Sequence, residues 1–229
     1  MAVLRETRVM TTTEVRSSAV EVPARRPIAW GPLLAGVLVV LALGGGLLLG
    51  RGMTSGVERV DSPVDVGFAQ DMKIHHAQAV EMSAIVHERS TDPAITYLAL
   101  DIMTTQQAQI GMMSGWLDLW RQTQTSTRPV MSWMGHDGPM EGMASDDEIA
   151  ALNTLPVEQM EEQFLRLMIR HHAGALPMAA FVVERGESPE LVGLARGMEQ
   201  GQAAEIDLMQ SMLMERGWEM EPGVGHSSH

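Results

Sequence analysis

The chain has 229 residues, of which 45% are apolar and 4% aromatic, and its formal net charge is −13. It contains no cysteine, which excludes disulfides, zinc–thiolate sites, iron–sulfur clusters and thiol nucleophiles. The acidic balance argues against a nucleic-acid-binding protein, because that function needs a basic face.

The first predicted element is a membrane-spanning helix at residues 28–50. This run holds no charged side chain, and about 20 residues suffice to cross a bilayer. Five arginines precede it in the basic segment 1–27, whereas Arg51 alone follows closely. Because basic segments stay in the cytoplasm, we expect a single-pass anchor with the N-terminus inside and the C-terminal part outside. A cleaved signal peptide is the alternative, although a leading segment of about 27 residues is long for one.

The part of the chain beyond the anchor is strongly acidic. It carries 26 acidic and 10 basic residues after Arg51, a formal charge of −16. Such a surface attracts cations and repels anionic polymers. A solvated acidic face that keeps the domain soluble is the alternative interpretation.

This exported part repeats itself at an offset of 96 residues. Residues 68–117 align with residues 164–213 without a gap, and nearly 40% of the aligned positions are identical. The pair His75-His76 meets the pair His171-His172. We therefore infer an internal duplication.

Each repeat is predicted to form a helical hairpin, repeat one at residues 62–121 and repeat two at residues 157–217. Apolar residues recur at helical spacing in both. Ser62 and Ser188 each precede a proline, which is typical of helix N-caps. Two such hairpins predict an all-α antiparallel four-helix bundle at residues 62–217.

Between the repeats, residues 122–145 form a linker rich in Ser, Thr, Gly, Pro and Met. A short helix is predicted to follow it, because Ser145 and Glu148 form a capping-box pattern. Gly217 suits the end of the last helix, and residues 218–229 are expected to form a disordered tail.

The duplicated motif Met-x-x-His-His-x-x-x-x-x-Met is the candidate metal site. Because adjacent helical residues differ by about 100° in direction, one histidine of each pair should face the bundle interior and the other its flank or a neighbouring helix. Neutral imidazoles and thioethers suit copper(I), and imidazole also accepts copper(II) or zinc. Simple core filling is the alternative. The predicted ligands are Met72, His75, His76, Met82, Met168, His171, His172 and Met178.

A second set of soft donors lies in the linker. A flexible segment has no core to fill, so we expect its thioethers to close around a soft cation as a capture arm. A hydrophobic flap lying on the bundle is the alternative. The predicted donors are Met131, Met134, His136, Met140 and Met143.

An enzymatic function requires more than these residues offer. A di-iron bundle uses Glu on two helices and a Glu-x-x-His motif on the other two. Here Gln106 and Gln202 occupy inner positions, and the facing pair Gln109 and Glu205 offers one carboxylate. We therefore expect a protein that is not an enzyme.

The motif Phe-x-x-x-Met-x-x-His-His-x-x-Ala-x-x-Met, followed by Leu-Ala and Gln-x-x-x-Ile-x-x-Met and present twice, resembles the family called domain of unknown function 305. The resemblance covers about residues 62–216 and is closer in repeat two. It implies a ferritin-like four-helix bundle, secreted or membrane-anchored in bacteria, and copper binding and resistance through Met and His in some members. The first repeat departs from the pattern with Gln109, where Glu is frequent, and with Glu81, where repeat two has Pro177.

The leading hypothesis is a copper-binding protein, with copper(I) preferred, anchored in the bacterial cytoplasmic membrane with its bundle outside. It would buffer copper or hand it on. The expected partners are the metal ion, the lipid bilayer and a handover protein or second copy of the chain, with no nucleic acid and no organic cofactor. The alternatives are a structural or interaction module of the cell envelope and a ferritin-like metal oxidase.

Overall fold

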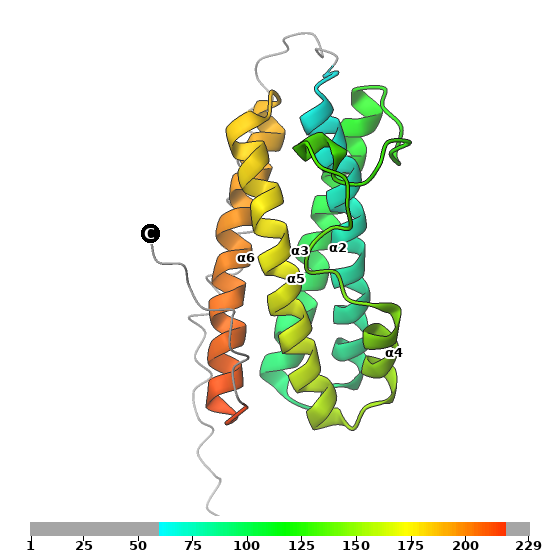
Figure 1. Ribbon diagram of the computed structural model, residues 1–229. Coiled ribbons are helices and arrows are strands. Elements are labelled where there is room, and N and C mark those ends of the chain that lie inside the picture. The colour runs from blue at the N-terminus through cyan, green and yellow to red at the C-terminus, as the bar shows by residue number, and fades with distance from the viewer. Residues whose placement is uncertain (1–59, 219–229) are drawn as a thin grey trace, which may run out of the picture. The chain divides into compact units, whose positions relative to one another are not determined.

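The computed structural model describes residues 60–218, and all regular secondary structure in this range is helical. Two long hairpins lie side by side (Figure 1). The first consists of α2 (Pro63–Arg89) and α3 (Pro93–Leu119), and the second of α5 (Val157–Arg185) and α6 (Pro189–Glu215). The predicted all-α fold is confirmed for these residues. The bounds of α3 and α6 differ by the offset of 96 found in the sequence.

The predicted basic segment 1–27, the membrane helix 28–50 and most of the predicted tail lie outside the described residues. Within residues 60–218, no helix combines the length and the apolar character needed to cross a bilayer.

Local sequence signals set the helix ends as predicted. The Ser62 hydroxyl accepts the N–H of the third residue of α2, and Ser188 does the same for α6. Ser145 and Glu148 form the predicted capping box of the short helix α4 (Asp146–Thr154). Gly217 takes a φ of 71° just after α6, a conformation that glycine adopts without steric cost.

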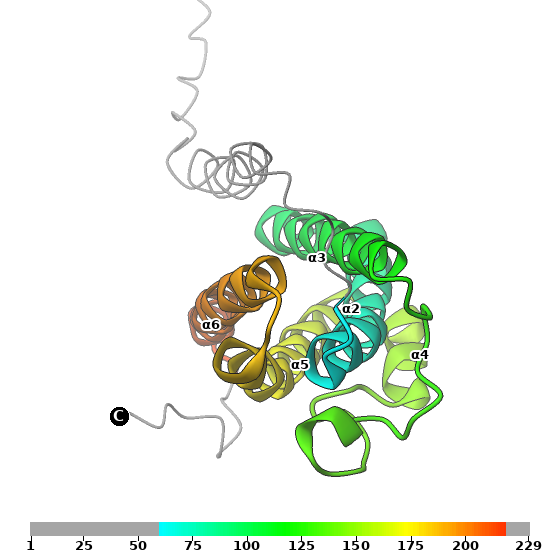
Figure 2. The same ribbon diagram turned by 90° about the horizontal axis from the view of Figure 1, so that it is seen from above.

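The helices α2 and α5 lie next to each other and run antiparallel, with α3 and α6 on their outer sides (Figures 1 and 2). A carboxylate at each end ties the hairpins together. Near the start of α2, Asp65 Oδ2 accepts the backbone N–H groups of Glu187 and Ser188 at 3.0 and 2.9 Å. Near the start of α5, Glu161 Oε1 accepts the hydroxyl of Ser90 at 2.7 Å. Asp65 and Glu161 are themselves 96 residues apart, so each hairpin holds the loop of the other.

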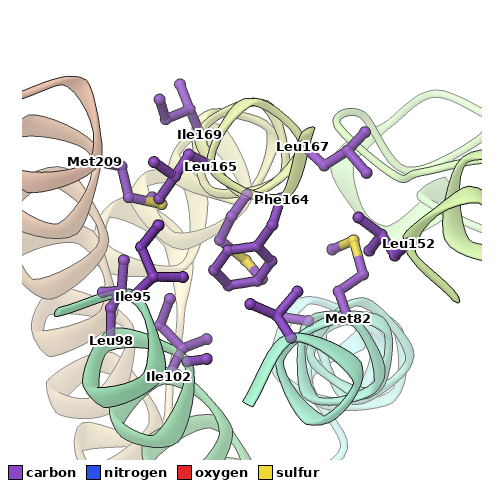
Figure 3. Packing of buried hydrophobic residues seen from close by; sticks show 14 of the residues in the cluster. Met82, Ile95, Leu98, Ile102, Leu152, Phe164, Leu165, Leu167, Ile169 and Met209 are labelled. Carbon is purple, nitrogen blue, oxygen red and sulfur yellow. The ribbon is translucent and has the colours of Figure 1, made fainter. Parts of the chain in front are cut away.

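The core divides into two apolar clusters. The lower cluster lies where α2 passes into α3, and Figure 3 shows its side chains, among them Met82, Ile102, Phe164 and Met209, pointing toward one another. The upper cluster lies where α5 passes into α6, and its members include Phe68, Met72, Met113, Met178 and Trp133. On α2 and α5, the stretch between the two clusters holds the four motif histidines.

The linker packs against α2 and α5. Asp71 Oδ2 on α2 accepts the backbone N–H of Met131 and the indole N–H of Trp133, both at 2.9 Å. Further along, the Gln78 side chain donates to the carbonyl of Ala144 at 2.9 Å and accepts its N–H at 2.6 Å. The 3-10 helix η2 (Ser132–Met134) between these anchors places Trp133 in the upper cluster.

Two glycines bring the linker backbone into contact with α5. A Cβ on Gly174 would lie 2.2 Å from the carbonyl oxygen of Glu141. Gly142 has a φ of 80°, and a Cβ there would lie 2.4 Å from the carbonyl oxygen of Arg170. The expectation that this flexible segment has no core to fill is therefore wrong, and the alternative of a flap lying on the bundle describes the geometry. The physical reason is that Asp71 and Gln78, about 60 residues upstream, accept hydrogen bonds from linker backbone N–H groups. The composition of the linker does not reveal these distant partners.

Replacing Gly174 with Ala tests this contact. The added methyl would force the linker from α5, and we expect the free energy of unfolding to fall by about 1–3 kcal/mol, as in overpacked cores. The matched control is Gly201→Ala in α6, where a Cβ meets nothing within 4 Å; there a gain of about 0.5–1 kcal/mol is expected. Urea denaturation measures both, and equal stability of the two variants would contradict the packing.

Candidate metal centre

The four motif histidines lie together in the middle of the bundle. His75 and His76 on α2 and His171 and His172 on α5 are all fully buried, at most 1% exposed. Because α2 and α5 run antiparallel, the two pairs meet at one level. The ring centroids of His75 and His171 lie 3.8 Å apart, and those of His171 and His172 lie 6.1 Å apart.

His75 and His171 form the inner pair. The Nε2–H of His75 donates to the carbonyl oxygen of Glu141 in the linker at 3.1 Å. The Nε2–H of His171 donates to the backbone carbonyl of His75 at 3.0 Å. Since a carbonyl oxygen can only accept, the proton of each neutral ring is on Nε2 and its Nδ1 carries a bare lone pair.

His76 and His172 form the outer pair, each turned toward the second helix of its own hairpin. The Nε2–H of His76 donates to Oε1 of Gln109 on α3 at 2.7 Å. The Nε2–H of His172 donates to Oε2 of Glu205 on α6 at 2.6 Å. One histidine of each pair thus faces the opposite hairpin and the other a neighbouring helix, as the helical geometry of the motif predicts.

All four Nδ1 atoms are buried without a hydrogen-bond partner. A buried acceptor left unpaired costs about 1–3 kcal/mol, and native proteins contain few of them. Histidines that ligate metals show this same arrangement, in which one ring nitrogen donates to an oxygen and the other binds the ion. Each of the four imidazoles therefore has one ring nitrogen free to act as a metal ligand.

Burial also keeps His75, His76 and His171 neutral. It lowers the pKa of His75 to about 4 and that of His76 to about 3, and the pKa of His171 also falls well below its ordinary value. The neighbouring imidazoles add to this effect, because a charge on one ring disfavours a charge on the next. Protons therefore do not compete for the Nδ1 lone pairs of these three rings at neutral or mildly acidic pH.

The motif methionines flank the histidines and are fully buried. Met72 and Met178 belong to the upper cluster, whereas Met82 and Met168 belong to the lower one. Each cluster thus contains one motif methionine from α2 and one from α5. Their thioethers pack among apolar side chains, and the structure places them within the core on either side of the imidazoles.

The linker donors are placed differently from one another. Met131 and Met140 are buried in the upper cluster, Met134 and Met143 are half-buried against it, and His136 is exposed. Within residues 60–218, no three or more His, Asp or Glu side chains are already arranged as a metal site. The inner pair of predicted ligands lies in direct ring contact, with centroids 3.8 Å apart.

Two features of the site are difficult to predict from the sequence. The backbone carbonyl of Glu141 accepts the hydrogen bond from His75 in the inner pair. Every residue type has such a carbonyl, so the sequence does not indicate this role. The buried amide of Gln106 has no partner for either of its polar atoms, and that of Gln202 has none for Oε1. Their inner positions can be predicted from periodicity, but their missing partners cannot.

The model of the family described as Domain of unknown function (DUF305) matches residues 65–213. This chain belongs to the DUF305 family. No curated protein matches it.

Solved DUF305 structures share this fold over most of their length. A putative secreted DUF305 protein from Streptomyces coelicolor is 48% identical, with a TM-score of 0.66, covering 71% of this chain and 97% of that one. A DUF305 fragment from Deinococcus radiodurans is 41% identical, with a TM-score of 0.59, covering 67% and 97%. CopM in its Cu(II)-bound form is 30% identical, with a TM-score of 0.54, covering 66% and 97%. CopM also has Cu(I)-bound and Ag-bound structures.

The stability of this DUF305 bundle should depend on pH because three of its histidines stay neutral when folded. Unfolded histidine takes up a proton near pH 6.5, whereas the pKa of folded His75 is about 4 and that of His76 about 3. Between pH 6.5 and about 4 the unfolded state binds more protons, so stability is full above this window and is lost as the pH falls through it. Each ring contributes up to about 1.4 kcal/mol per pH unit.

Urea denaturation at pH 7.5, 6, 5 and 4.5 measures this loss. His76→Gln should reduce the slope against pH by about one proton, with His136→Gln in the exposed part of the linker as the matched control. A metal-free protein equally stable from pH 7.5 to 4.5 would contradict the burial of neutral rings.

Proposed function

We propose that this protein binds copper outside the cytoplasm, with copper(I) preferred, and buffers the ion or hands it on. The observation that supports this proposal is the set of four buried imidazoles. Each donates its Nε2–H to a protein oxygen and keeps an unpartnered Nδ1. His75, His76, His171 and His172 are the primary ligands.

Copper(I) suits this donor set better than a hard divalent ion. The imidazoles are neutral, and the buried thioethers of Met72, Met82, Met168 and Met178 are soft and uncharged. A monovalent ion brings less charge into the core and therefore loses less hydration energy. The similarity to CopM, which has Cu(I)-, Cu(II)- and Ag-bound structures, supports copper as the metal, and the preference for copper(I) rests on the donor set.

In this proposal the linker covers the histidine site and also supplies Met and His ligands for the metal. Its Glu141 carbonyl lies on the inner histidine pair. Met134, Met143 and His136 are the linker donors that solvent reaches, so they make the first contact with an incoming ion. Met131 and Met140 anchor the cover in the upper cluster and become available when it lifts.

The protein acts from the membrane surface. Residues 28–50 span the bacterial cytoplasmic membrane with the N-terminus inside, so the ferritin-like bundle, built from a duplicated hairpin, stands in the extracytoplasmic space. The charge of −16 beyond Arg51 concentrates cations near it. A handover protein, or a second copy of the chain, receives the ion.

Competition titration with copper(I), using a chromophoric copper(I) chelator, tests this function. The wild-type protein should bind stoichiometrically, and the double variant His75→Gln/His171→Gln should lose more than about 100-fold in affinity, beyond the 10–100-fold typical of outer-shell changes. His87→Gln, on the same helix and hydrogen-bonded to the Thr96 carbonyl, is the matched control. Circular dichroism checks that each variant is folded. Unchanged affinity in the folded double variant would assign the histidines to packing alone.

A further inference from the structure

The two halves of the histidine site differ in one charge. His76 and His172 occupy corresponding positions, and each hydrogen-bonds a residue 33 positions later. That partner is the neutral amide of Gln109 in the first hairpin and the carboxylate of Glu205 in the second. The bond lengths are nearly equal, 2.7 and 2.6 Å, so the two outer histidines match in hydrogen-bond geometry and differ in the charge of their partners.

The surroundings sharpen this difference. Gln109 is 7% exposed, so the first half presents a neutral pair in the core. The side chain of Glu205 is 21% exposed and that of His172 is fully buried, so the second half connects a buried imidazole to a carboxylate near solvent. Burial, and then the charge of Glu205, raises the pKa of the Asp101 carboxyl on α3. Asp101 therefore lies close enough to Glu205 for the two carboxyl groups to repel each other.

Charge decides which ion each half accepts. The desolvation energy of an ion rises with the square of its charge, so a divalent ion loses about four times as much hydration energy as a monovalent ion of the same size. A carboxylate that accepts the imidazole N–H offsets part of this loss and makes the ring a stronger donor. A neutral amide supplies neither effect, and its half site is suited to a monovalent soft ion.

We propose that Glu205 makes the second half of the site competent for divalent copper, whereas the Gln109 half is restricted to monovalent ions. This inference rests on the proposed function and assigns Glu205 and Gln109 as positioning residues that set the charge of the ion. The second half can then hold copper in either oxidation state, whereas the first half holds copper(I) alone.

Isothermal titration of the full chain in detergent with Cu(II), and separately with Ag(I) as a redox-inert monovalent probe, tests this assignment. Glu205→Gln preserves the hydrogen bond and removes the charge. It should weaken Cu(II) binding at least about tenfold, in the range of outer-shell substitutions, and change Ag(I) affinity by less than about threefold. Glu199→Gln removes the same charge elsewhere on α6 and should change neither. Gln109→Glu in the Glu205→Gln background should restore Cu(II) binding.

The outcomes separate this inference from the proposed function. A wild-type protein that binds neither ion stoichiometrically would overturn both. Equal losses of Cu(II) and Ag(I) affinity in Glu205→Gln, or no loss of either, would overturn the charge assignment and leave copper binding intact. If Gln109→Glu does not fold, the electron paramagnetic resonance spectrum of bound Cu(II) decides: Glu205→Gln should change its nitrogen hyperfine pattern, and an unchanged spectrum would contradict the proposal.

Discussion

The structure depends on four imidazoles that are buried between two apolar clusters and only half satisfied. Each ring donates its Nε2–H to a protein oxygen, and each keeps an Nδ1 lone pair that meets no donor. Nothing in packing requires such a layer, since aliphatic side chains would fill the same space without leaving an acceptor unpaired. The proposed function assigns these lone pairs to a copper ion, and the low pKa values of His75, His76 and His171 keep protons from binding there in its place.

The rest of the fold serves to hold this layer. The antiparallel pairing of α2 and α5 brings His75 and His171 into contact, and the carboxylates of Asp65 and Glu161 fix that pairing from both ends. The linker closes the site from the side, held by Asp71 and by glycines that let two backbones touch. A mutation at the carboxylate contacts or at the linker contacts would therefore shift the positions of the imidazoles without touching them directly.

Much of this architecture can be predicted from the sequence because it depends on residues that are close together in the chain. Ser62, Ser188 and the Ser145–Glu148 pair cap the helices as predicted, since a cap depends on three or four neighbouring residues. The linker was mispredicted because its order comes from Asp71 and Gln78, whose role depends on contacts across about 60 residues. The same limit applies to the site: residue types indicated the candidate ligands, whereas the tautomers and the Glu141 carbonyl depend on contacts between segments far apart in the sequence.

The central claim concerns one atom of each ring, so the most direct test observes that atom. Long-range proton–nitrogen NMR of the four imidazoles, recorded as Ag(I) is added, resolves Nδ1 from Nε2. The account predicts that the Nδ1 signals shift by tens of parts per million on binding while the Nε2–H groups of His75 and His171 remain protonated. Rings whose nitrogen signals are unchanged at one equivalent of bound Ag(I), or that bind through Nε2, would contradict it.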